Sequence, residues 1–229
     1  CIEPLEQIAE MTHAAGALLI AVVLEPVSLG LLETPGKLGA DIVTGEGSAF
    51  GCGLNYGGPG LGLFGTRQEH VWQMPGRLVG QTTDDRGQTG YVLTMSSREQ
   101  HIRRARATSN ICTNEGLCML AAAIHLSLLG KQGLAELARI NAANAQASIK
   151  RLCQLEGVDL AFSAPIFNEF VLKMPGDVDA ALRRLEAAGI LGGLALKRFY
   201  PELDHHLLLC VTELNDAEQL ERYATALAG

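Results

Sequence analysis

The feature that most constrains the fold is a series of short apolar runs separated by turn residues in the first third of the chain. Residues 18–24, LLIAVVL, form a continuous apolar run, typical of a strand buried on both faces of a parallel sheet. A helical pattern over residues 4–13 precedes this run, and a short helical piece is expected within residues 26–37. Further strands are predicted over residues 41–44 and 61–65. This part should therefore form part of a larger α/β sheet, with an unfinished edge.

The middle of the chain predicts a hairpin and two helices. The hairpin signal is QTTDDRGQTGYVLT, residues 81–94. The helices are expected over residues 113–129 and 132–156, with a break at Gly130-Lys131. Because the first helix is apolar on nearly all sides, we expect it to be buried.

After residue 157 the pattern changes to two strands and two helices. Strands are predicted over residues 167–174 and 207–212, and helices over 178–188 and 216–227. These elements indicate a small α+β domain over residues 157–229, with residues 1–156 belonging to a larger domain.

Composition excludes several classes of protein. The 229 residues carry a formal net charge of −7, which argues against bulk nucleic-acid binding. The six cysteines form no C-x-x-C pair and no metal-ligand spacing, so we expect reduced thiols and no metal site. The apolar run over 14–24 is about half of what a bilayer requires, and glutamates rather than basic residues precede it. We therefore expect a cytoplasmic protein with no membrane partner.

The segment before the apolar helix is suited to an anion. It reads ATSNICTN, residues 107–114, and its hydroxyls, amides and backbone N–H groups lie at an expected helix N-terminus. Four arginines and a histidine lie directly upstream, namely Arg98, Arg103, Arg104, Arg106 and His101. The simpler alternative is an ordinary helix cap preceded by solvated charges.

Longer motifs carry a resemblance to a known family. GEGSAFG, YGGPGLG and REQHIRRARATSNICTN are long and chemically unusual. Together with the flanking sequence they resemble the first subunit, or N-terminal half, of the glycine decarboxylase P-protein of the glycine cleavage system. The resemblance covers essentially the whole chain. It implies part of a fold-type-I pyridoxal-phosphate-dependent transferase large domain, followed by a small α+β C-terminal domain. It also implies that the chain is the C-terminal part of a longer subunit.

The chain has no lysine where catalytic relatives carry the one that binds the cofactor. Residues 44–63 contain none, and Ser48-Ala49 stands where the catalytic half of the family has a His-Lys pair. A Schiff base with pyridoxal phosphate requires a lysine amine. We therefore expect no catalytic residue in this chain, with the cofactor bound covalently by the partner catalytic subunit, subunit 2.

The resemblance implies that residues of this chain contribute to the active site of the partner subunit. Loops of fold-type-I enzymes reach the cofactor of the neighbouring subunit, which makes Thr108, Ser109 and Asn110 candidates for binding its phosphate. Candidates for the interface or active-site mouth are Asn55, Tyr56, Gly57, Gly58, Arg98, His101, Arg103, Arg104 and Arg106. The glycines of residues 60–65 also fit a dinucleotide fingerprint, but they lie in an expected strand rather than before a helix, which argues against that site.

The resulting expectation is a P-protein subunit that supports glycine decarboxylation and aminomethyl transfer to the lipoyl group of the H-protein. Its expected partners are the catalytic subunit, in a heterotetramer, and the H-protein. Alone, the chain is expected to be inactive and to form a homodimer. The alternative is a catalytically silent subunit whose residues 98–106 dock an acidic carrier protein.

Overall fold

The computed structural model describes residues 1–108 and 115–229, which form two compact units. The N-terminal unit contains residues 5–26 and 33–128. The C-terminal unit contains residues 1–4, 27–32 and 129–229. Each unit is described by itself.

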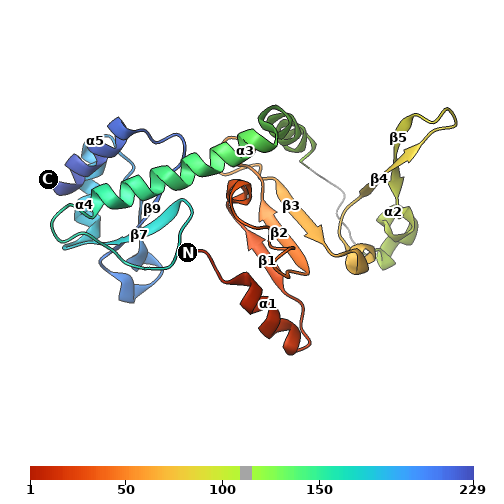
Figure 1. Cartoon of the computed structure of the whole chain (residues 1–229), viewed down its shortest axis with the longest axis horizontal. Helices are drawn as coiled ribbons and strands as arrows, with labels where there is room; N and C mark the ends of the chain where they lie inside the picture. The colour runs from red at the N-terminus through yellow and green to blue at the C-terminus, as the bar shows by residue number, and fades with distance from the viewer. Residues whose placement is uncertain (109–114) are drawn as a thin grey trace. The chain divides into compact units, whose positions relative to one another are not determined.

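The N-terminal unit contains a three-stranded sheet in the order β1-β2-β3 (Figure 1). β1 (Ile20–Val23) pairs in parallel with β2 (Ile42–Glu46), and β3 (Gly62–Thr66) pairs antiparallel with β2. α1 (Leu5–Ala14) precedes β1, and the 3₁₀ helix η1 (Pro26–Gly30) follows it in the chain. The helix, the three strands and the short helical piece predicted from the sequence are thus confirmed.

The expected burial of the first strand is not observed. Ile20 and Val22 expose 56% and 64% of their surface, whereas Ala21 between them is buried. β1 lies at the edge of the sheet and has β2 as its neighbour on one side. A continuous apolar run is typical of a parallel strand covered on both faces, and such covering requires elements beyond β2 and β3.

The predicted hairpin is also confirmed. β4 (Leu78–Thr83) pairs antiparallel with β5 (Thr89–Thr94), and Asp84 closes the turn by accepting hydrogen bonds from the N–H groups of Arg86 and Gln88. The 3₁₀ helix η2 (Gln68–Gln73) precedes the hairpin. η3 (Ser96–Arg98), α2 (Gln100–Arg103) and η4 (Arg104–Arg106) follow it.

α3 (Gly116–Leu152) corresponds to the two predicted helices, and its backbone is non-helical at Gly130, where φ is 60° and ψ is −177°. The break was therefore predicted correctly. The first segment is not buried, however, since Leu117 and Leu128 expose 81% and 83% of their surface. The apolar pattern indicates that this helix segment packs against other protein segments, but it does not indicate that those segments belong to the same chain. By length and composition alone, α3 could also span a membrane.

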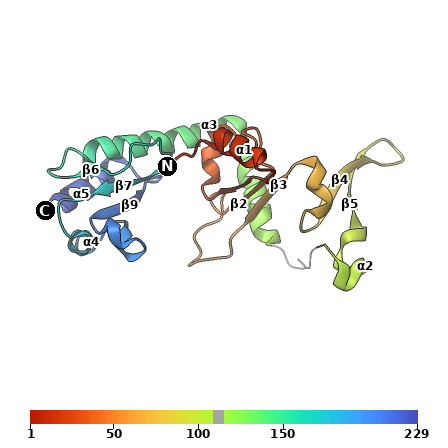
Figure 2. The ribbon, with the colours of Figure 1, turned by 90° about the horizontal axis from the view of Figure 1, so that it is seen from below.

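The C-terminal unit contains a four-stranded sheet in the order β6-β7-β9-β8. Figure 2 labels three of its strands, β6, β7 and β9. Its strands are β6 (Asp159–Leu160), β7 (Glu169–Lys173), β8 (Leu194–Ala195) and β9 (His206–Cys210). All three strand pairs in this sheet are antiparallel. Two 3₁₀ helices, η5 (Leu196–Arg198) and η6 (Pro201–Leu203), join β8 to β9.

Two helices complete the core of this unit, α4 (Val178–Ala187) and α5 (Ala217–Ala228). Leu185 of α4 and Leu227 of α5 belong to one buried cluster with Leu172 and Leu207 of the sheet. Asp216 caps α5 in a capping box with Gln219, which stabilises the helix start that the sequence predicted.

The compact units divide the chain mainly at residue 128, within α3, and the domain boundary expected at residue 156 stays a prediction. The reason lies in the second segment of α3. Ala145 and Leu152 of this segment are part of the buried cluster of the small unit. Packing of side chains rather than helix continuity thus sets the division.

Candidate functional site

The loop of residues 47–61, between β2 and β3, is closed at its base by one carboxylate. Oε1 of Glu46 accepts hydrogen bonds from the backbone N–H groups of Leu61 and Ser48, each at 2.8 Å. The N–H of Leu61, followed by that of Ser48, holds the pKa of Glu46 below its ordinary value. Gly60 packs closely against this carboxylate, because an added Cβ would lie 2.6 Å from Oε2 of Glu46 and the carboxylate would have to shift. The loop is therefore a defined projection with a fixed base.

The tip of this loop contains strained, exposed residues. Asn55 and Tyr56 both have positive φ values, 46° and 55°, which non-glycine residues rarely adopt. The following Gly57 and Gly58 also have positive φ. Tyr56 is fully exposed, as is most of Leu54. Backbone strain combined with exposed apolar side chains is common where a loop meets a ligand or another subunit. The four predicted residues 55–58 thus form one projecting tip.

No lysine lies on this loop. Ala49 is exposed and Ser48 is half-buried. The five lysines of the chain lie elsewhere: Lys37, Lys131, Lys150, Lys173 and Lys197. Two of them are in surface ion pairs, Lys37 with Glu33 at 2.6 Å and Lys197 with Asp179 at 2.7 Å. Residues 44–63 therefore offer no lysine amine, which a Schiff base with pyridoxal phosphate requires.

The side chain of Arg98 is buried against the segment before β4. This side chain is only 6% exposed, and it donates hydrogen bonds to the carbonyl oxygens of Met74 and Gly76. The N–H of Thr108 in turn donates to the Arg98 carbonyl at 3.2 Å. Arg98 therefore does not belong to the exposed basic surface expected from the sequence. A charge pattern alone cannot distinguish an arginine that binds carbonyl groups internally from one that faces solvent.

The remaining cationic residues of this segment are exposed. We refer to His101, Arg103, Arg104 and Arg106 as the basic surface. Nε of Arg103 donates to the carbonyl of Ser97 at 3.0 Å. Thr108 is exposed next to the basic surface, while Ser109 and Asn110 lie outside the described residues.

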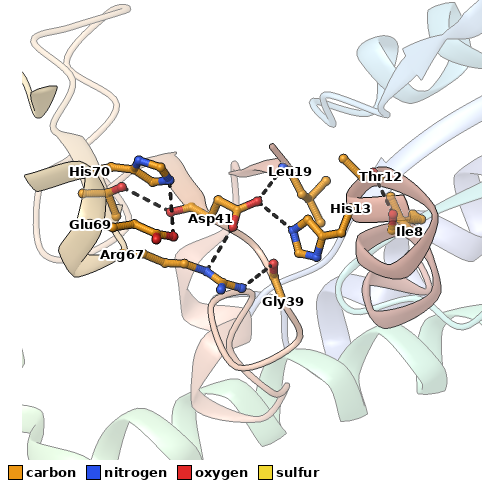
Figure 3. A network of polar contacts seen from close by, with 10 residues as sticks. Ile8, Thr12, His13, Leu19, Gly39, Asp41, Arg67, Glu69 and His70 are labelled. Atoms are coloured by element: carbon orange, nitrogen blue, oxygen red, sulfur yellow. Dashed lines mark hydrogen bonds and ion pairs between the residues drawn. The ribbon is translucent and has the colours of Figure 1, made fainter. Parts of the chain in front are cut away.

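A polar network centred on Asp41 was not anticipated (Figure 3). Asp41 is 4% exposed, and its Oδ2 accepts a hydrogen bond from the N–H of Leu19 at 2.8 Å and contacts Nε2 of His13 at 2.9 Å. Its Oδ1 pairs with Nε of Arg67 at 3.1 Å. The hydrogen bond from His13, followed by that from Leu19, lowers the pKa of Asp41. The network links α1, the start of β2 and the end of β3.

Glu69 and His70 lie beside the same carboxylate, with possible ligand atoms of all three residues within 4.8 Å of one another. Both oxygens of Asp41 already have partners, and one of these is the guanidinium of Arg67. A metal ion would have to displace that positive charge. We therefore interpret the cluster as a structural charge network rather than a metal site. In the sequence, this network is indicated only by Asp41, an acidic residue directly before a strand.

Comparison with known proteins identifies the family. The model of the "Glycine cleavage system P-protein" family matches residues 1–227. This chain belongs to the P-protein family. A relative from Rhizorhabdus wittichii, "Probable glycine dehydrogenase (decarboxylating) subunit 1", is 53% identical over 229 residues, which are 99% of this chain and 50% of that protein. One with the same name from Azorhizobium caulinodans is 55% identical over 228 residues, covering 99% of this chain and 51% of the relative. The chain thus spans about half the length of these P-protein subunits.

Solved structures agree with the P-protein assignment. A crystal structure of glycine decarboxylase (P-protein) of the glycine cleavage system, in inhibitor-bound form, matches with a TM-score of 0.90 and 40% identity, over 99% of this chain and 51% of that one. A NifS-like protein from Rickettsia africae matches with a TM-score of 0.66 at 14% identity, over 98% of this chain and 56% of that one, which indicates a shared fold. The predicted fold class, a partial fold-type-I pyridoxal-phosphate-dependent enzyme, is confirmed.

Proposed function

We propose that this chain is part of a P-protein subunit that supports the decarboxylation of glycine and the transfer of its aminomethyl group to the lipoyl group of the H-protein. In this proposal pyridoxal phosphate is bound covalently by a partner catalytic subunit. The observation that carries the division of labour is the absence of lysine from residues 44–63, together with membership of the P-protein family. When bound, the cofactor supplies the electron sink for decarboxylation.

Thr108 is the described residue best suited to act in trans. Its side chain is exposed, and its backbone N–H is bonded to the Arg98 carbonyl at 3.2 Å. The position of the hydroxyl thus depends on the buried Arg98, whose contacts with Met74 and Gly76 hold the segment together. A hydroxyl on such a support can donate to a phosphate oxygen of the partner's cofactor. Ser109 and Asn110 complete the proposed phosphate contact on the basis of sequence alone.

The projecting loop is proposed to border the shared active site. Glu46 fixes its base, and the exposed tip at Asn55–Gly58 carries apolar and amide groups. Such a tip can exclude water from a neighbouring subunit's site without providing a catalytic group. The exposed apolar residues in the first segment of α3 also support an interface with another subunit, because a large exposed apolar surface normally marks a contact surface.

Docking of an acidic carrier is the alternative function, and the exposure of the basic surface favours it. His101, Arg103, Arg104 and Arg106 are all exposed and close in sequence. Clustered positive charge accelerates the association of an acidic partner, and this acceleration weakens as salt is added. Under this alternative Thr108 would only stabilise the local fold.

Reductive labelling tests where the cofactor is held. The full-length complex with pyridoxal phosphate is treated with borohydride, digested and analysed by mass spectrometry. We expect one lysine of the partner subunit to be labelled to completion. Exposed Lys37 reports the non-specific background in the same digest. Stoichiometric labelling of any lysine of this chain would overturn the proposal.

Substitution of Thr108 separates the two functions. Loss of one charge-assisted hydrogen bond costs about 1.5–3 kcal/mol, so Thr108→Ala should weaken cofactor retention roughly 10- to 100-fold. Thr108→Ser, which keeps the hydroxyl, is the matched control and should retain the cofactor. Unchanged retention in Thr108→Ala, combined with weaker carrier binding after charge reversal of Arg103 and Arg104, would favour docking. Arg222→Glu, an exposed arginine of α5, controls for a general effect of charge.

A further inference from the structure

The start of the projecting loop packs directly against α3. Sγ of Cys52 lies 3.5 Å from the carbonyl oxygen of Cys118, in the first turns of the helix. One residue earlier, an added Cβ on Gly51 would lie only 2.8 Å from Cβ of His125. Cys118 and His125 are seven residues apart, so they lie on the same face of the helix. The loop and the helix are therefore in contact over about two turns.

The contact places two cysteine side chains in one environment. Cys52 and Cys118 are both half-buried, and both are free thiols. Burial, followed by the nearby Cys118, raises the pKa of the Cys52 thiol. Because Sγ of Cys52 lies 3.5 Å from the carbonyl oxygen of Cys118, the two residues are in direct contact. They come from segments 66 residues apart in sequence, so the fold and not the chain brings them together.

We propose that Cys52 and Cys118 are a redox pair that forms a reversible intramolecular disulfide by exchange with a small-molecule disulfide such as oxidised glutathione. One cysteine thiolate attacks the small disulfide and releases one thiol, which leaves a mixed disulfide on the protein. The second thiolate then attacks the protein sulfur of that mixed disulfide and releases the second thiol. The cysteine pair loses two electrons and two protons, and the small disulfide is reduced to two thiols.

The disulfide would fasten the loop to the helix. The loop reaches its exposed tip at Tyr56 only four residues after Cys52, and α3 begins two residues before Cys118. A covalent link at this point therefore limits how far the loop tip can move relative to the helix start. This inference does not depend on the proposed function, because it concerns only the chemistry of the two thiols.

Peptide mapping tests the proposal on the full-length subunit in complex with its partner. The complex is incubated with oxidised glutathione, the remaining thiols are alkylated, and the protein is digested with trypsin without reduction. The expected product joins peptide 38–67, which contains Cys52, to peptide 107–131. Because thiolates are the attacking species, its rate of formation should rise at least several-fold from pH 7 to pH 9. Dithiothreitol should release the two peptides.

Two variants assign the bond, since peptide 107–131 also contains Cys112. Cys118→Ser should abolish the joined product, whereas Cys112→Ser should retain it. Cys210→Ser, in the C-terminal unit, is the control for an unrelated exposed thiol. Absence of the joined product in the wild type, or its persistence in Cys118→Ser, would overturn the proposal. The wild-type peptide map tests for the disulfide by itself, even if a variant folds poorly.

Discussion

Gly45 in β2 allows β1 and β2 to pair closely, and replacing it with alanine tests that packing. Gly45 lies opposite Val23 in the parallel ladder. An added Cβ would lie 2.5 Å from the carbonyl oxygen of Val23, which is backbone and cannot rotate away. The two strands would have to separate locally by about half an ångström, as in other overpacked sites.

The magnitude follows from two opposing contributions. Overpacking of this kind costs about 1–3 kcal/mol. Because Gly45 does not have a positive φ, alanine also restricts the unfolded chain, which returns about 0.4–1 kcal/mol. We therefore expect Gly45→Ala to reduce the free energy of unfolding by about 0–2.6 kcal/mol.

Gly62→Ala is the matched control in the neighbouring strand. Gly62 lies in β3, paired with Glu46, and an added Cβ there has no atom within 4 Å. This variant should be neutral or slightly stabilising. Urea unfolding measures the difference, and hydrogen exchange of the amides in residues 20–23 and 42–46 shows whether the loss is local. Equal stability of the two variants would refute the packing argument.

Three further predictions address other parts of the chain. The pKa of Asp41 is lowered in the folded state, so its contribution to stability is present above the unfolded-state pKa, near 3.8, and is lost as pH falls through the folded-state pKa. Asp41→Asn should therefore make the unfolding midpoint depend less steeply on pH in the acid range. An unchanged slope would contradict this. Leu185→Ala, at a fully buried site, should cost about 2–5 kcal/mol in urea unfolding, whereas Leu191→Ala, at a site 96% exposed, should cost almost nothing; similar losses would argue against the core described for the C-terminal unit. The isolated chain should self-associate through the exposed face of α3, which light scattering over a concentration series can measure, and a monomer at every concentration would contradict this.

Much of the secondary structure could be predicted from local patterns. The capped start of α5, the hairpin of β4 and β5, and the break at Gly130 each depend on neighbouring residues, so a window of the sequence contains the needed information. The family assignment also came from linear motifs, and the comparisons confirm it. The absence of lysine from residues 44–63 is likewise a property of the sequence and required no coordinates.

Tertiary contacts decided what the side chains do. The sequence places Arg98 in a run of predicted surface charges. In the structure it is buried, because the carbonyl groups of Met74 and Gly76, which are 24 and 22 residues away in sequence, lie beside it. Asp41 becomes the centre of a network only when α1 and the end of β3 meet at one point. The contact of the Cys52 thiol with the backbone carbonyl of Cys118 arises in the same way. A local pattern determines which helix or strand forms, because its hydrogen bonds and periodicity are short-range. The environment of a charged or reactive group depends on which distant segments pack beside it, and only the folded chain determines that.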